Sequence, residues 1–79
     1  MKAEEILRCF MRGRFSGYHD ELKNSDALDG IIDSLGLFEI VEFIEKEFQI
    51  KIPNYDFSPS KFSTISEMIK LIQKIKNDG

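Results

Sequence analysis

The chain has 79 residues, of which 42% are hydrophobic and 11% aromatic, and this predicts one small domain with a modest core. Its single cysteine excludes an internal disulfide, and no apolar run approaches the roughly 20 residues that a membrane span requires. The N-terminus lacks the basic and then apolar layout of a secretory signal, so we expect a cytoplasmic protein.

The formal net charge of −3 is unevenly distributed along the chain. Residues 18–49 carry nine acidic and two basic side chains, whereas the two ends are mildly basic. Acidic surfaces attract basic partners and repel phosphate backbones. We therefore expect the central segment to meet protein partners and not nucleic acid.

The first predicted element is a helix from about Ala3 to Phe15. Its apolar stripe consists of Ala3, Ile6, Leu7 and Phe10. A long polar loop follows from Ser16 to Gly30, with turn-forming residues at positions 24–26. The apolar residues at its end are expected to tuck back onto the core: Leu28, Ile31 and Ile32.

A second helix is predicted from Asp33 to near Phe48. At about 100° per residue, one stripe collects Leu37, Ile40, Val41, Ile44 and Phe48. Ser34 lies at the edge of that stripe, whereas Leu35 and Phe38 point away from it. Large apolar side chains rimmed by acids and directed away from the core are typical of a docking patch.

Pro53 ends this helix, and residues 54–61 have room for one short helical turn, interrupted by Pro59. Thr64 to Glu67 fits a capping box at the start of the last helix. The stripe of that helix consists of Ile65, Met68, Ile69, Ile72 and Ile75. The sequence thus predicts an all-α fold, a four-helix bundle of three main helices and one short helix with a long first loop.

Ser34 stands out because Asp33 suits the N-cap of the second helix, which places the Ser34 hydroxyl at the positive end of the helix dipole. Residues 33–41, Asp-Ser-Leu-Gly-Leu-Phe-Glu-Ile-Val, resemble the phosphopantetheine attachment site of acyl carrier proteins. The likeness extends through Pro53 and through residues 61–65, and covers about Leu28 to Ile72.

The resemblance implies one carrier domain over residues 1–79, with no catalytic residues and no metal site. It implies that a phosphopantetheinyl transferase moves 4′-phosphopantetheine from coenzyme A onto Ser34. A ligase would then load an acyl or aminoacyl group as a thioester for downstream acyl-processing enzymes, and the carrier is expected to act as a monomer. The resemblance and the helical phase assign transferase and partner recognition to Asp33, Leu35, Phe38, Glu39 and Glu42.

Helical phase also predicts a pocket for the acyl chain between the second and last helices. Its expected lining is Ile40, Ile44, Phe62, Ile65 and Met68.

Three details bear on the type of carrier. Gly36 stands where the housekeeping fatty-acid carrier usually has Asp, Glu42 stands where many such carriers have an apolar residue, and the loop over residues 54–62 is long. Gly36 and the long loop are more similar to free-standing carriers that work with an AMP-forming ligase, D-alanyl carriers included. The cargo stays open, as does the pathway, whether fatty acid or lipid biosynthesis, secondary metabolism or cell-wall modification.

Other interpretations remain beside the carrier. The chain could be an unmodified helical interaction module that docks through Leu35, Phe38 and Glu39. A serine hydrolase lacks support, because Ser34 has no Gly-x-Ser-x-Gly elbow and His19, the only histidine, lies in a polar loop. We expect Cys9 to be a small buried thiol. The acids of residues 26–33 miss the spacing of a calcium loop.

Overall fold

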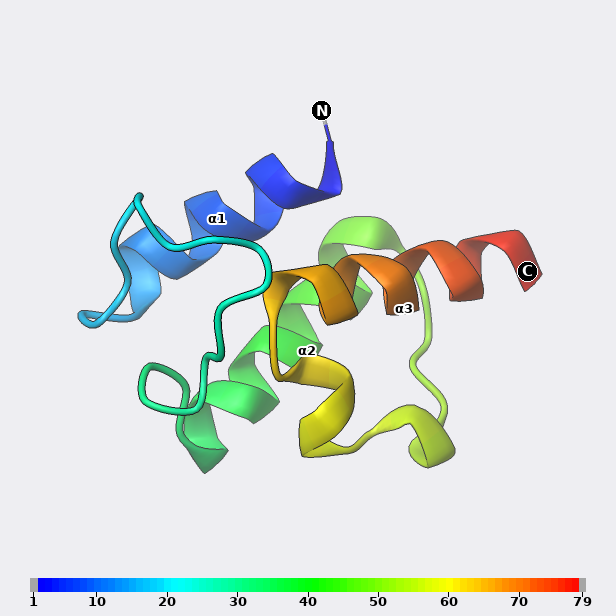
Figure 1. Cartoon of the computed structure of the whole chain (residues 1–79). Helices are drawn as coiled ribbons and strands as arrows, with labels where there is room; N and C mark the ends of the chain where they lie inside the picture. Colours follow the sequence, from blue (N-terminus) through cyan, green and yellow to red (C-terminus); the bar gives the residue numbers. More distant parts are fainter. Residues whose placement is uncertain (1, 79) are drawn as a thin grey trace.

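The computed structural model describes residues 2–78 and contains no strand in that range. Three α-helices occur in the order α1 (Ala3–Arg14), α2 (Ser34–Phe48) and α3 (Ile65–Asp78). Residues 15–33, here called the first connection, join α1 to α2 without helix. Residues 49–64, the second connection, contain two 3-10 turns, η1 (Asn54–Asp56) and η2 (Pro59–Phe62). In Figure 1 most of the first connection lies on the left of the view, and the second connection runs from the right to the front centre; the predicted all-α class is confirmed.

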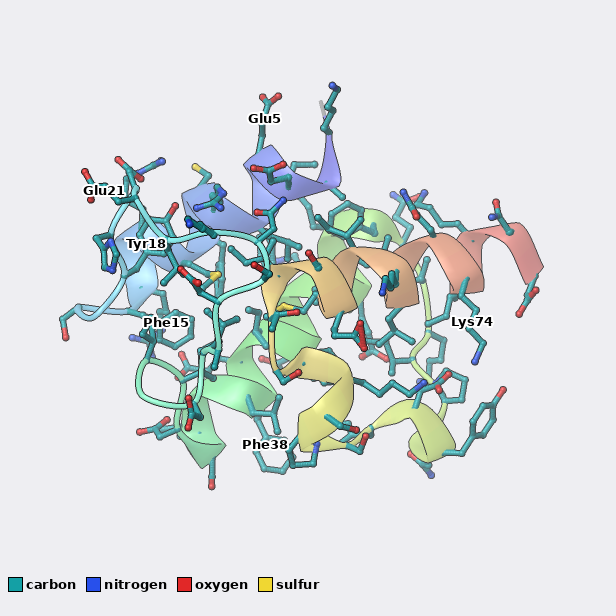
Figure 2. The ribbon with its side chains drawn as sticks, in the orientation of Figure 1. Glu5, Phe15, Tyr18, Glu21, Phe38 and Lys74 are labelled. Carbon is teal, nitrogen blue, oxygen red and sulfur yellow. The ribbon has the colours of Figure 1, made fainter. Side chains whose placement is uncertain are left out.

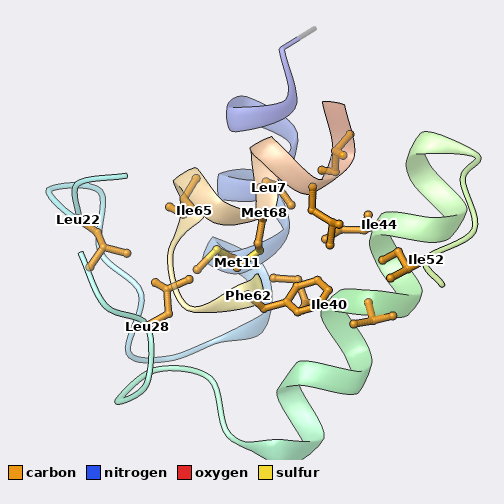
Figure 3. Close-up of a cluster of buried hydrophobic side chains, with 13 residues drawn as sticks. Leu7, Met11, Leu22, Leu28, Ile40, Ile44, Ile52, Phe62, Ile65 and Met68 are labelled. Atoms are coloured by element: carbon orange, nitrogen blue, oxygen red, sulfur yellow. The ribbon is translucent and has the colours of Figure 1, made fainter. Parts of the chain in front are cut away.

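All three helices and both connections contribute to one core (Figure 3). Its buried apolar side chains are Leu7, Met11, Leu22, Leu28, Ile40, Val41, Ile44, Ile52, Phe62, Ile65, Met68, Leu71 and Ile72. On α1 the burial is centred on Leu7 and Met11, whereas the predicted Ala3, Ile6 and Phe10 are only half-buried. The predicted stripe of α3 omitted Leu71. It is buried because α3 packs against both α1 and η2, which widens its buried face.

The helix ends follow the local sequence closely. Acids occupy the first turn of α1 and arginines its last turn, an arrangement that favours the helix dipole at both ends. Before α3, Thr64 Oγ1 accepts a hydrogen bond of 3.0 Å from the Glu67 amide, which confirms one half of the predicted capping box. The Glu67 carboxylate turns outward instead, 3.4 Å from Lys70 Nζ.

Arg8 holds the first connection onto α1. Its guanidinium donates hydrogen bonds to the Leu22 carbonyl (2.6 Å), Asn24 Oδ1 (2.7 Å), the Tyr18 hydroxyl (3.1 Å) and Glu4 (3.1 Å). The Tyr18 bond is the main cause of a raised Arg8 pKa, and bonds from Asn24 and then Arg8 lower the pKa of Glu4. A loop without helix is thus fixed by one side chain on the neighbouring helix.

The first connection is hydrogen-bonded to the end of the second connection and to the start of α3. The Leu28 amide donates to the Ser63 carbonyl at 2.9 Å, and the Ser66 amide donates to the Asn24 carbonyl at 3.0 Å. Leu28 is buried and Ile31 and Ile32 pack against the core, so the predicted return of this segment to the core is confirmed.

The second connection differs from its prediction, because it contains two helical turns and Pro59 starts the second turn. Proline suits the first position of a helical turn, where its missing N–H would have had no partner. The carboxylate of Asp56 is buried, 3.7 Å from Lys61 Nζ and 3.5 Å from Lys74 Nζ. Lys74, which projects from α3 (Figure 2), thus anchors this segment.

Glu45 also has a structural role that the sequence did not suggest. Its Oε2 accepts a hydrogen bond of 2.8 Å from the Ile52 amide. Between these residues the helix ends at Gln49, whose left-handed backbone (φ 54°, ψ 49°) reverses the chain direction.

Candidate carrier site

Ser34 is the first residue of α2 and is exposed. Asp33 precedes it as the N-cap, and Asp33 Oδ1 accepts a hydrogen bond of 2.7 Å from the Gly36 amide. The capping prediction for Asp33 is therefore confirmed. The cap orients the first turn so that the Ser34 hydroxyl stands in solvent at the positive end of a 15-residue helix.

Packing within this first turn favours glycine at position 36. A Cβ atom at position 36 would lie 2.7 Å from Cε1 of Phe15 and 3.2 Å from both Asp33 Oδ1 and Ile32 Cγ2. The Phe15 ring of the first connection, labelled in Figure 2, thus occupies the space where a side chain at position 36 would begin. This contact gives a physical reason why position 36 holds glycine and not the aspartate that is usual in the housekeeping fatty-acid carrier.

The two apolar residues predicted to leave the core face are exposed. Leu35 is 67% exposed and Phe38 is 61% exposed, so this part of the prediction is confirmed. Phe38 projects beside the second connection, and its ring centroid lies 5.4 Å from that of Phe57 (Figure 2). Glu42 is exposed on the same helix. Their role in docking stays a prediction.

Glu39 is less free than the helical wheel indicated. Arg14 Nε donates a hydrogen bond to Glu39 Oε2, and Nη2 of the same arginine forms an ion pair with that oxygen. The pair joins the last turn of α1 to α2 across 25 residues of sequence. No local pattern connects two residues so far apart, so this pair could not be predicted from the sequence.

The five residues of the predicted acyl pocket lie in the closed core. Ile40, Ile44, Ile65 and Met68 have no exposed surface, and Phe62 is 3% exposed. Whether this core opens around a cargo stays a prediction. A recess of about 350 Å³ instead lies between the two connections and the start of α2. Its lining is Leu28, Asp29, Ile32, Leu37, Pro59, Ser60, Phe62 and Ser63.

The remaining candidates lie away from Ser34 or serve the fold. Cys9 is exposed, contrary to the predicted burial, because α1 turns its Leu7 and Met11 side inward. His19 Nδ1 lies 3.4 Å from Glu21 Oε1 in the first connection, and both side chains are exposed. Asp26 caps a turn by accepting from the Lys23 amide at 2.8 Å.

Within residues 2–78, no group of three or more His, Cys, Asp or Glu side chains is arranged to hold a metal ion. None of the helices described there combines the length and the apolar character needed to cross a membrane.

No family model matches the chain. It is 29% identical over 75 residues to the D-alanyl carrier protein of Streptococcus uberis, and the match covers 94% of each chain. The D-alanyl carrier protein of Streptococcus pyogenes serotype M5 is 28% identical with the same coverage. A shorter match of 33% identity over 46 residues covers 58% of this chain and 53% of the probable acyl carrier protein PigG of Serratia sp.. The chain is thus similar to carrier proteins over nearly its whole length.

The family predicted from residues 33–41 is therefore confirmed, and the two D-alanyl carriers match almost the whole length of this carrier. Carrier proteins are not themselves enzymes, which agrees with a chain expected to have no catalytic residues. The residues that resemble the attachment site include Ser34, and Ser34 is exposed in the structure.

Proposed function

We propose that this carrier bears 4′-phosphopantetheine on Ser34 and carries an acyl or aminoacyl group as a thioester on the terminal thiol of that arm. The observation that carries the proposal is the exposed Ser34 hydroxyl, directly after a formed Asp33 N-cap, in a chain similar to carriers over 94% of its length. A phosphodiester there would gain about 0.3–1 kcal/mol from the helix dipole at low ionic strength.

The proposed attachment is a group transfer that needs a separate enzyme. The Ser34 oxygen attacks the phosphorus that bears the pantetheine arm of coenzyme A, a new O–P bond forms, and adenosine 3′,5′-bisphosphate leaves with the electrons of the broken P–O bond. The transferase takes the serine proton and holds the Mg²⁺ ion. Ser34 therefore needs no base from its own chain, and the only histidine, His19, is paired with Glu21.

The proposed recognition surface is the outer face of the first turns of α2. Asp33, Leu35, Phe38 and Glu42 are exposed there, which supports contact with the transferase and with later partners. Glu39 belongs to the same surface, but it is already paired with Arg14. Two large exposed apolar side chains flanked by acids are the usual composition of a docking patch.

For the cargo we favour a small aminoacyl group loaded by an AMP-forming ligase. Two observations support this choice. Relatives that match 94% of the chain carry D-alanyl in their names, and the α2–α3 core that would have to receive a long acyl chain is closed. The recess beside the start of α2 is open to solvent and offers apolar contact to the arm or to a short cargo.

The second candidate function is an interaction module that is never modified. The observation in its favour is the exposure of Leu35 and Phe38, which would serve a binding partner without any arm. The two functions differ in their dependence on Ser34, because a module that binds through the apolar patch alone keeps its affinity in Ser34→Ala.

The deciding experiment is the intact mass of the chain after incubation with coenzyme A, Mg²⁺ and a broad-specificity phosphopantetheinyl transferase. We expect the parent and a Ser25→Ala control to gain one phosphopantetheine group, and Ser34→Ala to gain none. If the folded parent gains no mass while the same enzyme modifies a control carrier, the carrier chemistry proposed for Ser34 is wrong. A gain of mass in Ser34→Ala would assign the arm to another residue.

A further inference from the structure

The face of α2 beside α1 carries balanced charges, although the segment over residues 18–49 is strongly acidic. A groove of about 490 Å³ runs along this face. It is lined by Phe10, Arg14, Glu39, Glu42, Phe43 and Lys46. Two acids and two bases therefore surround a floor made by the stacked rings of Phe10 and Phe43, whose centroids are 4.1 Å apart at 17°.

Arg14 supplies one of the two positive charges that balance the acids of this groove. It comes from α1, outside the acidic segment, and holds the Glu39 carboxylate with two nitrogens. The Arg14 side chain is 51% exposed and that of Glu39 is 26% exposed, so a partner that docks on α2 would meet the cation beside the carboxylate. A basic partner group gains less from a paired carboxylate than from a free one.

We propose that Arg14 is a specificity-determining residue of this carrier, because it compensates Glu39 and so weakens docking to enzymes with a uniformly basic surface. The inference rests on the proposed function, since it concerns the enzymes that act on Ser34. The partner that fits this face contacts Leu35 and Phe38 through apolar groups and presents both signs of charge to the groove.

A matched pair of arginines makes the test possible. Arg12 and Arg14 both lie in the last turn of α1, both are more than half exposed, and each forms a pair with one acid. Arg12 pairs with Asp20 in the first connection, whereas Arg14 pairs with Glu39 on α2. Arg12→Ala and Arg14→Ala change the net charge equally but release different acids; Arg12 also lies over the Tyr18 ring, 5.8 Å from its centroid.

The experiment measures kcat/KM for phosphopantetheine transfer to the full chain, with one transferase at a series of NaCl concentrations. At low salt we expect Arg14→Ala to raise kcat/KM about two- to fivefold, whereas Arg12→Ala leaves it near the parent value. Added salt should remove the gain. In the double variant Arg14→Ala/Glu39→Gln the gain should disappear, because the released carboxylate is its cause. Circular dichroism checks that each variant keeps its helices.

Two results would overturn the inference in distinguishable ways. Equal kcat/KM for Arg14→Ala, Arg12→Ala and the parent would show that the pair does not control docking, while modification of Ser34 would stand. A gain that survives in the Arg14→Ala/Glu39→Gln variant would assign it to a cause other than Glu39. A parent chain that gains no mass would overturn the proposed function, and this inference with it.

Discussion

The two connections of this carrier are held in different ways. In the first connection, Arg8 makes hydrogen bonds to Tyr18, Leu22 and Asn24, and its own side chain is only 16% exposed. In the second connection, Asp56 faces two lysines at 3.5 and 3.7 Å, and one of its oxygens has no hydrogen-bond partner within residues 2–78. Arg8 fixes the first connection with several directional bonds, whereas the second combines single hydrogen bonds, at Ile52 and Ser63, with charge attraction at longer range around Asp56.

The difference indicates which side of the carrier yields more easily. The second connection also begins at Gln49, a non-glycine residue in the left-handed region, which is a strained conformation for an L-residue. Both connections line the recess beside the start of α2. We infer that the recess widens by movement of the second connection, while the first acts as its fixed wall.

We expect the largest effect from Arg8→Met, because Arg8 holds the first connection onto α1. The substitution removes the hydrogen bonds of the guanidinium and leaves the Leu22 carbonyl and Asn24 without their donor. We expect unfolding in urea to require about 3 kcal/mol less free energy. The exposed control, Arg12→Met, should cost less than about 1 kcal/mol. Equal losses in the two variants would refute the anchoring role of Arg8.

A smaller effect is expected from Asp56→Asn. The side chains of Lys61 and Lys74 are already 43% and 49% exposed, so water can solvate them once the carboxylate is removed. The free energy of unfolding should therefore fall by about 1 kcal/mol. Hydrogen exchange should become faster over residues 54–62 and remain unchanged over residues 16–32. Faster exchange in both connections would mean that they do not move independently. Asp20→Asn, which breaks an exposed pair, is the matched control.

The smallest effect is a gain in stability from Gln49→Gly. Glycine adopts the left-handed backbone without steric cost, which should add about 0.5–1 kcal/mol to the free energy of unfolding, measured in urea. The control is Gln73→Gly, in the middle of α3, where glycine should lower the free energy of unfolding by about 1 kcal/mol. A loss at position 49 would mean that the Gln49 side chain contributes more than its backbone strain costs.

Local patterns in the sequence predicted the elements that position Ser34. The apolar stripe and the Asp33 cap predicted α2 to within one residue of its start, and the same helical phase predicted the exposure of Leu35 and Phe38. The phase of α1 was predicted less well. Leu7 and Met11 face the core and Cys9 faces solvent, because the position of α1 depends on α3 and on the first connection.

Helical period, caps and turn residues act over a few residues, so the sequence by itself determined the helices, the carrier family and the position of Ser34. The tertiary structure decided which distant charges meet: Arg8 with Asn24, Arg14 with Glu39, and Asp56 with Lys74. It also decided that Phe15 leaves no room for a side chain at Gly36. These contacts depend on how the helices and connections pack in space, and that packing cannot be predicted from the spacing of residues along the chain.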